Sequence, residues 1–375
     1  MNPPVVVLAG VRWDFLWQRH QTLAALFARA GYSTVFVETT GLSNPRPNAA
    51  SARNVLARLL RPGERRARPE ENLSVYSPLA LPPTSEAFRR ANERFFIPRI
   101  AHDLREKLAA PPILVAYLPT RTTLDIIPRL EPRLVLYDCA DEYAAFPGAP
   151  RDIAATEREL IRRADLVSCT SSHLLERVGR ARPDAFLSGP GVEYELFEPL
   201  ADERKPGGSV RTVCCFGNLD GERIDFDALE AVAAAGFELR LVGGVKGAPS
   251  RFLRSPGVDY VGEVAHRDLP KALSGVDAFV LPYKANGLTR GISPAKTYEC
   301  LATGRPVVSA PLPAMKELSE HIYIAHAPEE YVGILKNFEA TETEEGIRAR
   351  RELARRNSWD ARFAEIEEAV WRKLG

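Results

Sequence analysis

The chain has 375 residues, of which 45% are hydrophobic and 26% charged, and its formal net charge is +1. This length allows two or three domains, each with its own hydrophobic core. A charge balance so close to zero argues against a nucleic-acid-binding protein, in which an excess of basic residues is typical.

The cysteines and the N-terminus indicate a cytoplasmic protein. None of the five cysteines forms a CxxC pair, and each sits in or beside an apolar stretch, so we expect buried free thiols in a reducing compartment and no metal site. The N-terminus carries no basic leader with a long apolar core. Nowhere does an apolar run approach the roughly 20 residues that span a bilayer.

The first 38 residues predict a strand, a helix and a second strand, over residues 4–10, 18–31 and 34–38. They lack the GxGxxG pattern of a dinucleotide site. The loop after the first strand, with Arg12, Trp13 and Asp14, is a candidate ligand-recognition site. The alternative, which stays open, is that its tryptophans only pack against the start of the helix.

A basic segment follows between residues 45 and 110, with an apolar stripe that includes Leu59 and Leu60 and with Phe95 nearby. Such a segment can lie on an anionic membrane surface, or it can be an ordinary solvated face. Its arginines are Arg46, Arg53, Arg58, Arg61, Arg65, Arg66, Arg68, Arg89, Arg90, Arg94, Arg99 and Arg105.

A buried strand over residues 134–137 leads into a loop that carries Asp138 and Asp141. Parallel α/β enzymes place catalytic groups at the carboxyl ends of strands, and an aspartate there can take a proton from a hydroxyl group. The alternative is that one of these aspartates caps a helix. Further on, residues 201–209 have the composition of a linker, and the next strand ends at Gly217, where backbone can approach a ligand closely.

The stretch from Phe279 to Pro311 combines the strongest local signals. It predicts a strand, a loop, a helix over residues 295–302 and a second strand, with Ser293 as the N-cap and Pro294 as the first helical residue. Lys296 adds a positive charge near the helix start, and Glu299 can accept hydrogen bonds from vicinal sugar hydroxyls. A diphosphate joined to a ribose fits this spacing.

The sequence SPAKTYECLATGRPVVSA in this stretch resembles the C-terminal nucleotide-sugar motif of GT-B glycosyltransferases, and the resemblance extends over nearly the whole chain. It implies an α/β fold of two Rossmann-like domains that face each other across a cleft. We expect an acceptor domain over residues 1–200, a donor domain over 210–355, and a C-terminal helix over 356–375 that returns to the first domain.

The resemblance also implies roles for individual residues. Lys296 is expected to contact the donor diphosphate and Glu299 the ribose. Ala140 stands where many relatives have a histidine, so the expected base is Asp141, with Asp138 second; Gly291 stands where many retaining relatives have a glutamate. The remaining donor residues are expected to be Gly217, Glu263, Val264, Tyr283, Arg290, Ser293 and Pro294, and the acceptor residues Arg12, Trp13 and Asp14.

The implied function is transfer of a sugar from a nucleoside diphosphate sugar, expected to be UDP-linked, to a glycan or lipid-linked hydroxyl in cell-surface polysaccharide synthesis. No metal or other cofactor is expected, because no DxD or histidine and carboxylate cluster stands in a suitable loop. Peripheral attachment to the inner face of the cytoplasmic membrane is a further hypothesis. The alternatives are a nucleotide-sugar epimerase of the same fold and a catalytically silent nucleotide-sugar-binding protein.

Overall fold

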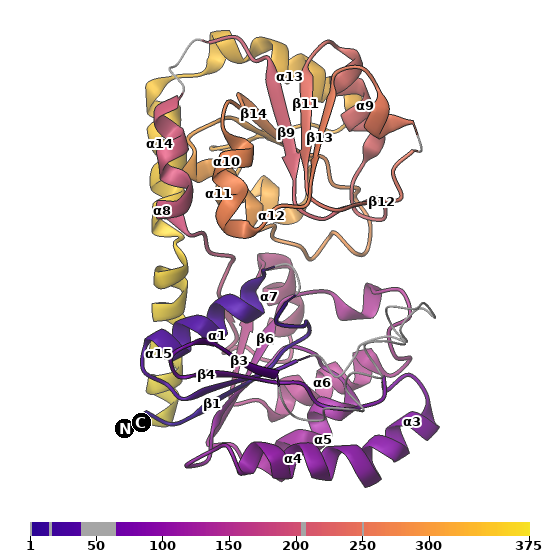
Figure 1. Cartoon of the computed structure of the whole chain (residues 1–375), viewed down its shortest axis with the longest axis vertical. Helices are drawn as coiled ribbons and strands as arrows, with labels where there is room; N and C mark the ends of the chain where they lie inside the picture. Colours follow the sequence, from indigo (N-terminus) through magenta and orange to yellow (C-terminus); the bar gives the residue numbers. More distant parts are fainter. Residues whose placement is uncertain (1, 15–16, 39–64, 204–207, 250) are drawn as a thin grey trace. The chain divides into compact units, whose positions relative to one another are not determined.

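The structure is a computed structural model that describes residues 2–14, 17–38, 65–203, 208–249 and 251–375. The chain folds into two compact units (Figure 1). Unit 1 consists of Met1–Thr170, Leu174–Ser188 and Phe363–Gly375. Unit 2 consists of Ser171–His173 and Gly189–Arg362.

Unit 1 is built on an eight-stranded sheet with the order β3-β4-β2-β1-β5-β6-β7-β8. Its strands are parallel except for the antiparallel pair β3 and β4. The central strands are apolar runs buried on both faces, as parallel sheets require. The strands are β1 (Val5–Leu8), β2 (Thr34–Val37), β3 (Arg65–Glu70), β4 (Leu73–Tyr76), β5 (Ile113–Ala116), β6 (Leu134–Cys139), β7 (Leu166–Cys169) and β8 (Phe186–Leu187).

Helices flank this sheet (Figure 1). Helix α1 begins one residue after Gln18, whose backbone N–H donates to the side chain of Gln21 as in a capping box. The helical segments are α1 (Arg19–Arg29), α3 (Glu86–Ala91), the π-helix η1 (Asn92–Phe96), α4 (Ile97–Arg105), α5 (Arg121–Leu130), η2 (Tyr143–Ala145), α6 (Ile153–Arg163) and α7 (Ser172–Gly179).

Unit 2 has a six-stranded, wholly parallel sheet with the order β13-β11-β9-β14-β15-β16, and a two-stranded ribbon of β10 and β12. Strands β9 and β14 are fully buried in its core. The strands are β9 (Thr212–Phe216), β10 (Leu219–Asp220), β11 (Glu238–Val242), β12 (Val245–Lys246), β13 (Val258–Gly262), β14 (Ala278–Leu281), β15 (Val307–Ser309) and β16 (Tyr323–Ile324).

The helices of unit 2 include two contacting pairs, α9 with α13 and α11 with α14. The helical segments after Ser188 are α8 (Tyr194–Phe197), η3 (Glu198–Glu203), α9 (Phe226–Ala234), η4 (Phe252–Arg254), η5 (His266–Asp268), α10 (Leu269–Leu273), α11 (Lys296–Ala302), α12 (Pro313–Lys316), α13 (Pro328–Thr341), α14 (Glu344–Arg356) and α15 (Trp359–Leu374).

The boundary between the units differs from the one expected at residues 201–209. The chain passes into unit 2 after Ser188, because Val192, Phe197 and Leu200 are buried in the core of unit 2. Part of the expected linker, residues 204–207, lies outside the described residues. The last helix, α15, starts in unit 2 and joins unit 1 from Phe363 onward.

Several local predictions are confirmed. The opening strand, helix and strand are present, as are strands β14 and β15 with helix α11 between them. All five cysteines are buried free thiols. In the described parts of the chain, no helix has the length and apolar character needed to cross a membrane.

Candidate functional site

Three glycines mark the carboxyl ends of neighbouring strands in unit 2. Gly217 follows β9, Gly243 follows β11 and Gly262 ends β13, and all three have positive φ angles, of 100°, 127° and 87°. The N–H of Gly217 donates to the carbonyl of Val242 at 2.8 Å, and that of Gly243 to the carbonyl of Gly262 at 2.7 Å. A Cβ atom at Gly243 would collide with the carbonyl oxygen of Gly217. The three strands therefore end at residues that have no side chain of their own, so their backbone can approach a ligand.

Lys296 is the first residue of α11 and extends over the end of β9. Its Nζ atom donates a hydrogen bond to the carbonyl oxygen of Phe216 and lies 5.8 Å from the ring centroids of both Phe216 and Tyr283. Burial disfavours the charged amine, but its interactions with Tyr283, Cys215 and Glu299 outweigh burial and raise the pKa of Lys296 above the ordinary lysine value. The amine is therefore a fixed positive charge beside Gly217.

Glu299 lies one turn after Lys296 on the same helix, and 14% of its side chain is exposed. Burial raises the pKa of this carboxyl, while His266 and Lys296 act in the opposite direction. The Nδ1 atom of His266 lies 4.0 Å from Glu299 Oε1, and its Nε2 atom lies 3.8 Å from Glu193 Oε2. Sequence reasoning assigned no role to His266 or to Glu193.

The start of α11 corrects one prediction. The helix begins at Lys296, with Ala295 as the N-cap and no capping side chain, so Ser293 is not the cap and Pro294 is not the first helical residue. The N–H groups of Thr297 and Tyr298 instead donate to the carbonyls of Pro294 and Ala295. These bonds make a tighter first turn, which moves the regular helix two residues along the chain.

The other predicted donor residues of unit 2 are Arg290, Glu263 and Val264. Arg290 is exposed, and its backbone N–H donates to the carbonyl of Asn286 at 3.0 Å. Glu263 is exposed and borders Gly244, and Val264 is half-buried against the unit 2 core. Unit 2 thus brings Gly217, Tyr283, Lys296 and Glu299 together. Within the described ranges, no group of three or more His, Cys, Asp or Glu side chains could hold a metal ion.

In unit 1, Asp138 has a structural partner. It is fully buried in β6, and its carboxylate accepts hydrogen bonds from Arg19 Nε at 2.6 Å and from Ser168 Oγ at 2.8 Å. Arg19 Nη2 also donates to Ser188 Oγ at 2.9 Å. A buried, paired carboxylate of this kind fixes α1 against the sheet, and it is poorly placed to meet an acceptor hydroxyl. Asp141, by contrast, is half-buried in the loop after β6.

The expected acceptor loop is packed against its own unit. Trp13 meets Phe36 and Trp17 edge-on, at ring-centroid distances of 5.0 and 5.3 Å, and its backbone N–H donates to Glu38 Oε1 at 3.0 Å. Arg12 and Asp14 form an ion pair at 3.0 Å. These contacts favour the packing alternative for Trp13, and they leave Arg12 and Asp14 as the polar edge of the loop.

Two α/β units built on mainly parallel sheets, with Lys296 and Glu299 near the strand ends of the second, are the arrangement expected of a GT-B glycosyltransferase. Residues 210–335, which lie in unit 2, match the family described as Glycosyl transferases group 1. Lys296 and Glu299 lie inside the matched range. The expected class and fold are confirmed.

Comparison with known proteins shows a similar fold over the whole chain. The Bacillus subtilis protein TuaH, named as a candidate teichuronic acid biosynthesis glycosyltransferase, is 27% identical over 263 residues, which are 62% of this chain and 65% of TuaH. The chain thus spans about two thirds of that relative. Sucrose-phosphate synthase from Thermosynechococcus elongatus has the same fold, with a TM-score of 0.68 at 16% identity over 100% of this chain and 99% of that one. Anabaena HepE, solved with UDP-glucose, has a TM-score of 0.66 at 13% identity, and the match covers 99% of this chain and 100% of the HepE chain.

Proposed function

We propose that the protein transfers a sugar from a UDP-linked donor to a hydroxyl of a glycan or lipid-linked acceptor in cell-surface polysaccharide synthesis. The observation that carries this proposal is the placement of the Lys296 amine beside Gly217, with the Glu299 carboxylate one turn away. The name of TuaH supports the polysaccharide assignment, and the UDP-glucose bound to HepE supports the donor class.

In this proposal the donor diphosphate lies at the glycine-lined strand ends of unit 2. The Lys296 amine stabilises the charge that builds up on the leaving diphosphate, which is a preorganised electrostatic contribution. The Glu299 carboxylate accepts hydrogen bonds from the two ribose hydroxyls. Asp141 is the proposed base, because it lies in the loop at the carboxyl end of β6, whereas the Asp138 carboxylate is held in a buried ion pair with Arg19.

A panel of nucleotide sugars with mass spectrometry of the products tests the proposal. Transfer to an acceptor supports it, whereas a new epimer formed without acceptor indicates an epimerase, and nucleotide binding without transfer or hydrolysis indicates a silent binding protein. Lys296→Ala should lose most turnover and keep its fold. Lys336→Ala, which removes an exposed lysine of α13, is the matched control. Full turnover of Lys296→Ala would overturn the assignment of this site.

We also propose that unit 1 contacts the inner face of the cytoplasmic membrane through α3 and η1. Phe95 is 63% exposed and Phe88 is 37% exposed, and the Arg94 guanidinium lies 5.7 Å from the Phe95 ring centroid. Two exposed aromatic rings beside a cation fit a membrane interface. The part of the expected basic patch before residue 65, including Arg46, Leu59 and Leu60, lies outside the described residues.

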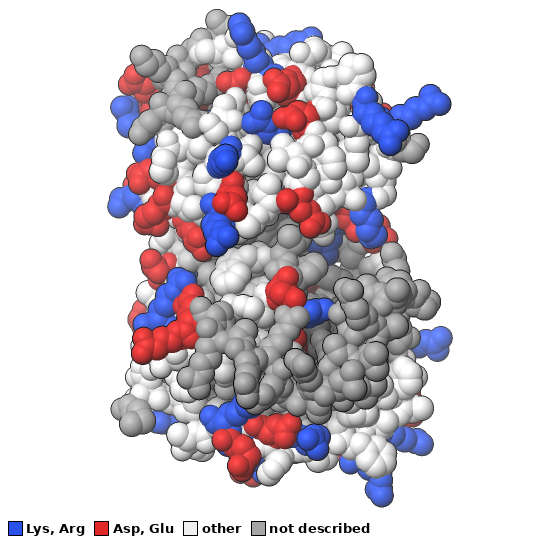
Figure 2. Space-filling view, viewed as in Figure 1, with Lys and Arg blue, Asp and Glu red and all other residues white. Residues whose placement is uncertain are grey.

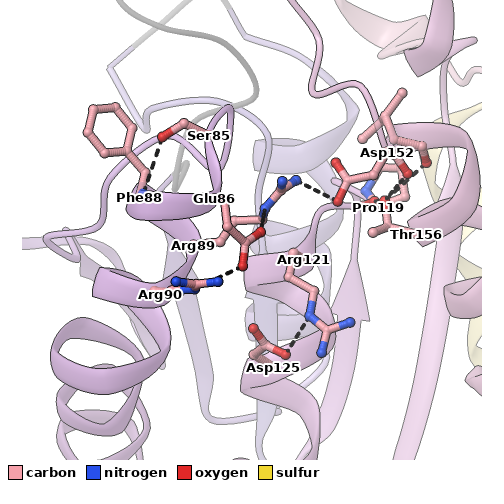
Figure 3. A network of polar contacts seen from close by, with 11 residues as sticks. Ser85, Glu86, Phe88, Arg89, Arg90, Pro119, Arg121, Asp125, Asp152 and Thr156 are labelled. Atoms are coloured by element: carbon pink, nitrogen blue, oxygen red, sulfur yellow. Dashed lines mark hydrogen bonds and ion pairs between the residues drawn. The ribbon is translucent and has the colours of Figure 1, made fainter.

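Several arginines of this region form ion pairs with carboxylates, which weakens the electrostatic part of the membrane hypothesis. Arg89 bonds to Glu86 and Asp152, and Arg90 bonds to Glu86 (Figure 3). Arg99 and Arg105 also lie within ion-pair distance of carboxylates, and charges of both signs are interspersed on the face shown in Figure 2. We therefore expect the aromatic rings to contribute more than net charge.

Sedimentation with anionic liposomes at low and high salt tests this contact. Phe95→Ser should reduce binding at both salt concentrations, because the lost contribution is apolar. Leu187→Ser, which removes an exposed apolar side chain from β8, is the control and should bind like the wild type. Absence of binding by the wild type at low salt would reject the membrane hypothesis without affecting the proposed transfer reaction.

A further inference from the structure

Three side chains from separate segments of unit 2 form a row that ends at the proposed ribose site. Glu193 precedes α8, His266 begins η5 and Glu299 lies in α11. The two ring nitrogens of His266 face different carboxylates, Nε2 toward Glu193 at 3.8 Å and Nδ1 toward Glu299 at 4.0 Å. Both distances are within ion-pair range and longer than a hydrogen bond, so each contact acts as an ion pair only when the imidazole carries its charge.

The exposure of the row changes along its length. The exposed fraction of the side chain is 43% for Glu193, 25% for His266 and 14% for Glu299. The ring of Phe197 meets the imidazole edge-on, with 5.9 Å between the ring centroids. His266 is thus held in place by an aromatic neighbour, and its charge acts on Glu299 through surroundings that are less polar than bulk water.

The charged groups that face Glu299 are Lys296 from its own helix, His266 from η5 and Glu193 from the loop before α8. The Lys296 amine is already bonded to the carbonyl of Phe216. Of the side chains that the structure describes, His266 is the one placed within ion-pair distance of the Glu299 carboxylate. Glu193 repels Glu299 and competes with it for the same imidazolium.

A carboxylate that holds a ribose must be ionised. An ionised carboxylate accepts hydrogen bonds at both oxygens, whereas a protonated carboxyl loses part of this capacity. We propose that His266 is a positioning residue whose imidazolium holds the Glu299 carboxylate in the orientation that receives the ribose hydroxyls, and that Glu193 weakens this hold. This inference rests on the proposed function for the identity of the ligand.

Calorimetric titration with UDP between pH 5.5 and pH 8 tests the inference. At pH 5.5, His266→Ala and His266→Gln should both bind UDP about tenfold more weakly than the wild type, since a change of one unit in a pKa is a factor of ten. At pH 8, where an imidazole is ordinarily neutral, both should approach the wild type. Glu193→Gln should bind UDP at pH 5.5 at least as tightly as the wild type.

Controls separate this electrostatic role from simple packing. His326→Ala removes an exposed imidazole of unit 2 and should leave UDP affinity unchanged at both pH values. The inference would be overturned if His266→Gln lost the same UDP affinity at pH 5.5 and at pH 8. It would also be overturned if His266→Ala and Glu193→Gln lost UDP affinity equally.

A second readout keeps the inference distinct from the proposed function. If the wild type binds no nucleotide at any pH, the proposed function fails. The titration of the Glu299 carboxyl can still be followed by carbon-13 NMR, with its signal assigned from a Glu299→Gln variant. His266→Ala should then raise the pKa of Glu299, and Glu193→Gln should not. An unchanged titration of Glu299 in His266→Ala would overturn the inference.

Discussion

The Nζ atom of Lys296 lies 2.6 Å from the position that a Cβ atom would occupy at residue 217, where Gly217 has a φ angle of +100°. The amine can reach the carbonyl of Phe216 only because residue 217 has no side chain. The glycine at the end of β9 and the lysine at the start of α11 therefore form one structural feature, although they are far apart in the sequence.

Gly217→Ala should displace the Lys296 amine and weaken UDP binding by about tenfold or more, which calorimetry can measure. The left-handed backbone at this position adds a cost of about 1–2 kcal/mol to the free energy of folding, and denaturant unfolding can measure that cost. Gly333→Ala is the matched control, because its Cβ would meet no atom within 4 Å and it lies in the interior of α13. The control should bind UDP normally and be slightly more stable.

Local patterns in the sequence were sufficient to predict the strand, helix and strand that carry Lys296 and Glu299. Apolar runs marked the strands, and the segment between them was correctly predicted to hold a helix that carries Lys296 and Glu299. The prediction of Ser293 as the N-cap was wrong because Ser before Pro is also compatible with a tight turn. A short-range signal does not distinguish a helix start from such a turn. The contact between Gly217 and Lys296 depends on the pairing of β9 with β14, which no local pattern specifies.

Long-range polar contacts were beyond sequence reasoning. Arg19 and Asp138 are buried partners that lie far apart in the chain, and each was considered only in its own loop or helix. The row of Glu193, His266 and Glu299 likewise joins three segments. The boundary after Ser188 was missed because the residues that follow look like a loop, yet they fill the core of unit 2.

Breaking the buried ion pair should destabilise unit 1. Asp138→Asn leaves the Arg19 guanidinium buried without its counter-charge, and the loss of one partner of such a pair costs about 3–5 kcal/mol. Replacing both residues, in Arg19→Met with Asp138→Leu, should recover part of this loss, since an apolar pair has no charge to desolvate. Urea unfolding of the single and double variants measures the difference.

The same variants separate a structural role for Asp138 from a catalytic one. Turnover per folded molecule should fall much further in Asp141→Asn than in Asp138→Asn. If Asp138→Asn were fully folded and still inactive, Asp138 would be the base and the proposed role of Asp141 would be wrong.

His20 should make the stability of the protein depend on pH. It is buried, its Nδ1 atom accepts the Gly10 N–H at 2.9 Å, and its ring stacks on Tyr117. Desolvation by burial, partly opposed by Asp138, lowers the pKa of His20 to about 3 in the folded protein. Between this value and the ordinary histidine pKa of about 6.5, the unfolded chain binds the proton and the folded chain does not.

The free energy of unfolding should therefore fall by about 1.4 kcal/mol for each pH unit below about 6.5, over and above the contribution of other groups. His20→Gln cannot be protonated, so this part of the slope should be missing in the variant. Urea unfolding of both proteins from pH 7.5 to pH 5 gives the two slopes. Parallel slopes would show that His20 is protonated in the folded state, which would contradict its burial as a neutral ring.

Phe27 and Tyr32 of unit 1 hold helix α15 through three contacts. Phe363 meets Phe27 edge-on with 4.9 Å between the ring centroids, and the Tyr32 hydroxyl donates to Glu367 at 2.7 Å and accepts from Trp371 Nε1 at 2.8 Å. Phe363→Ala should cost about 3 kcal/mol through the lost burial and the cavity that remains. Tyr32→Phe should cost about 1 kcal/mol, because it removes one acceptor and one donor at a partly solvated site.

Hydrogen exchange of the amides after Phe363 distinguishes local release of α15 from unfolding of all of unit 1. Both variants should exchange faster in α15 than the wild type, with the larger effect in Phe363→Ala, while the amides of β1 and β5 keep their protection. Glu368→Ala removes an exposed ion pair with Arg372 and is the control; it should change exchange little, because exposed pairs contribute at most about 1 kcal/mol. Equal loss of protection in α15 and in β1 would show that the helix and the sheet unfold as one cooperative unit, and that these contacts stabilise unit 1 as a whole.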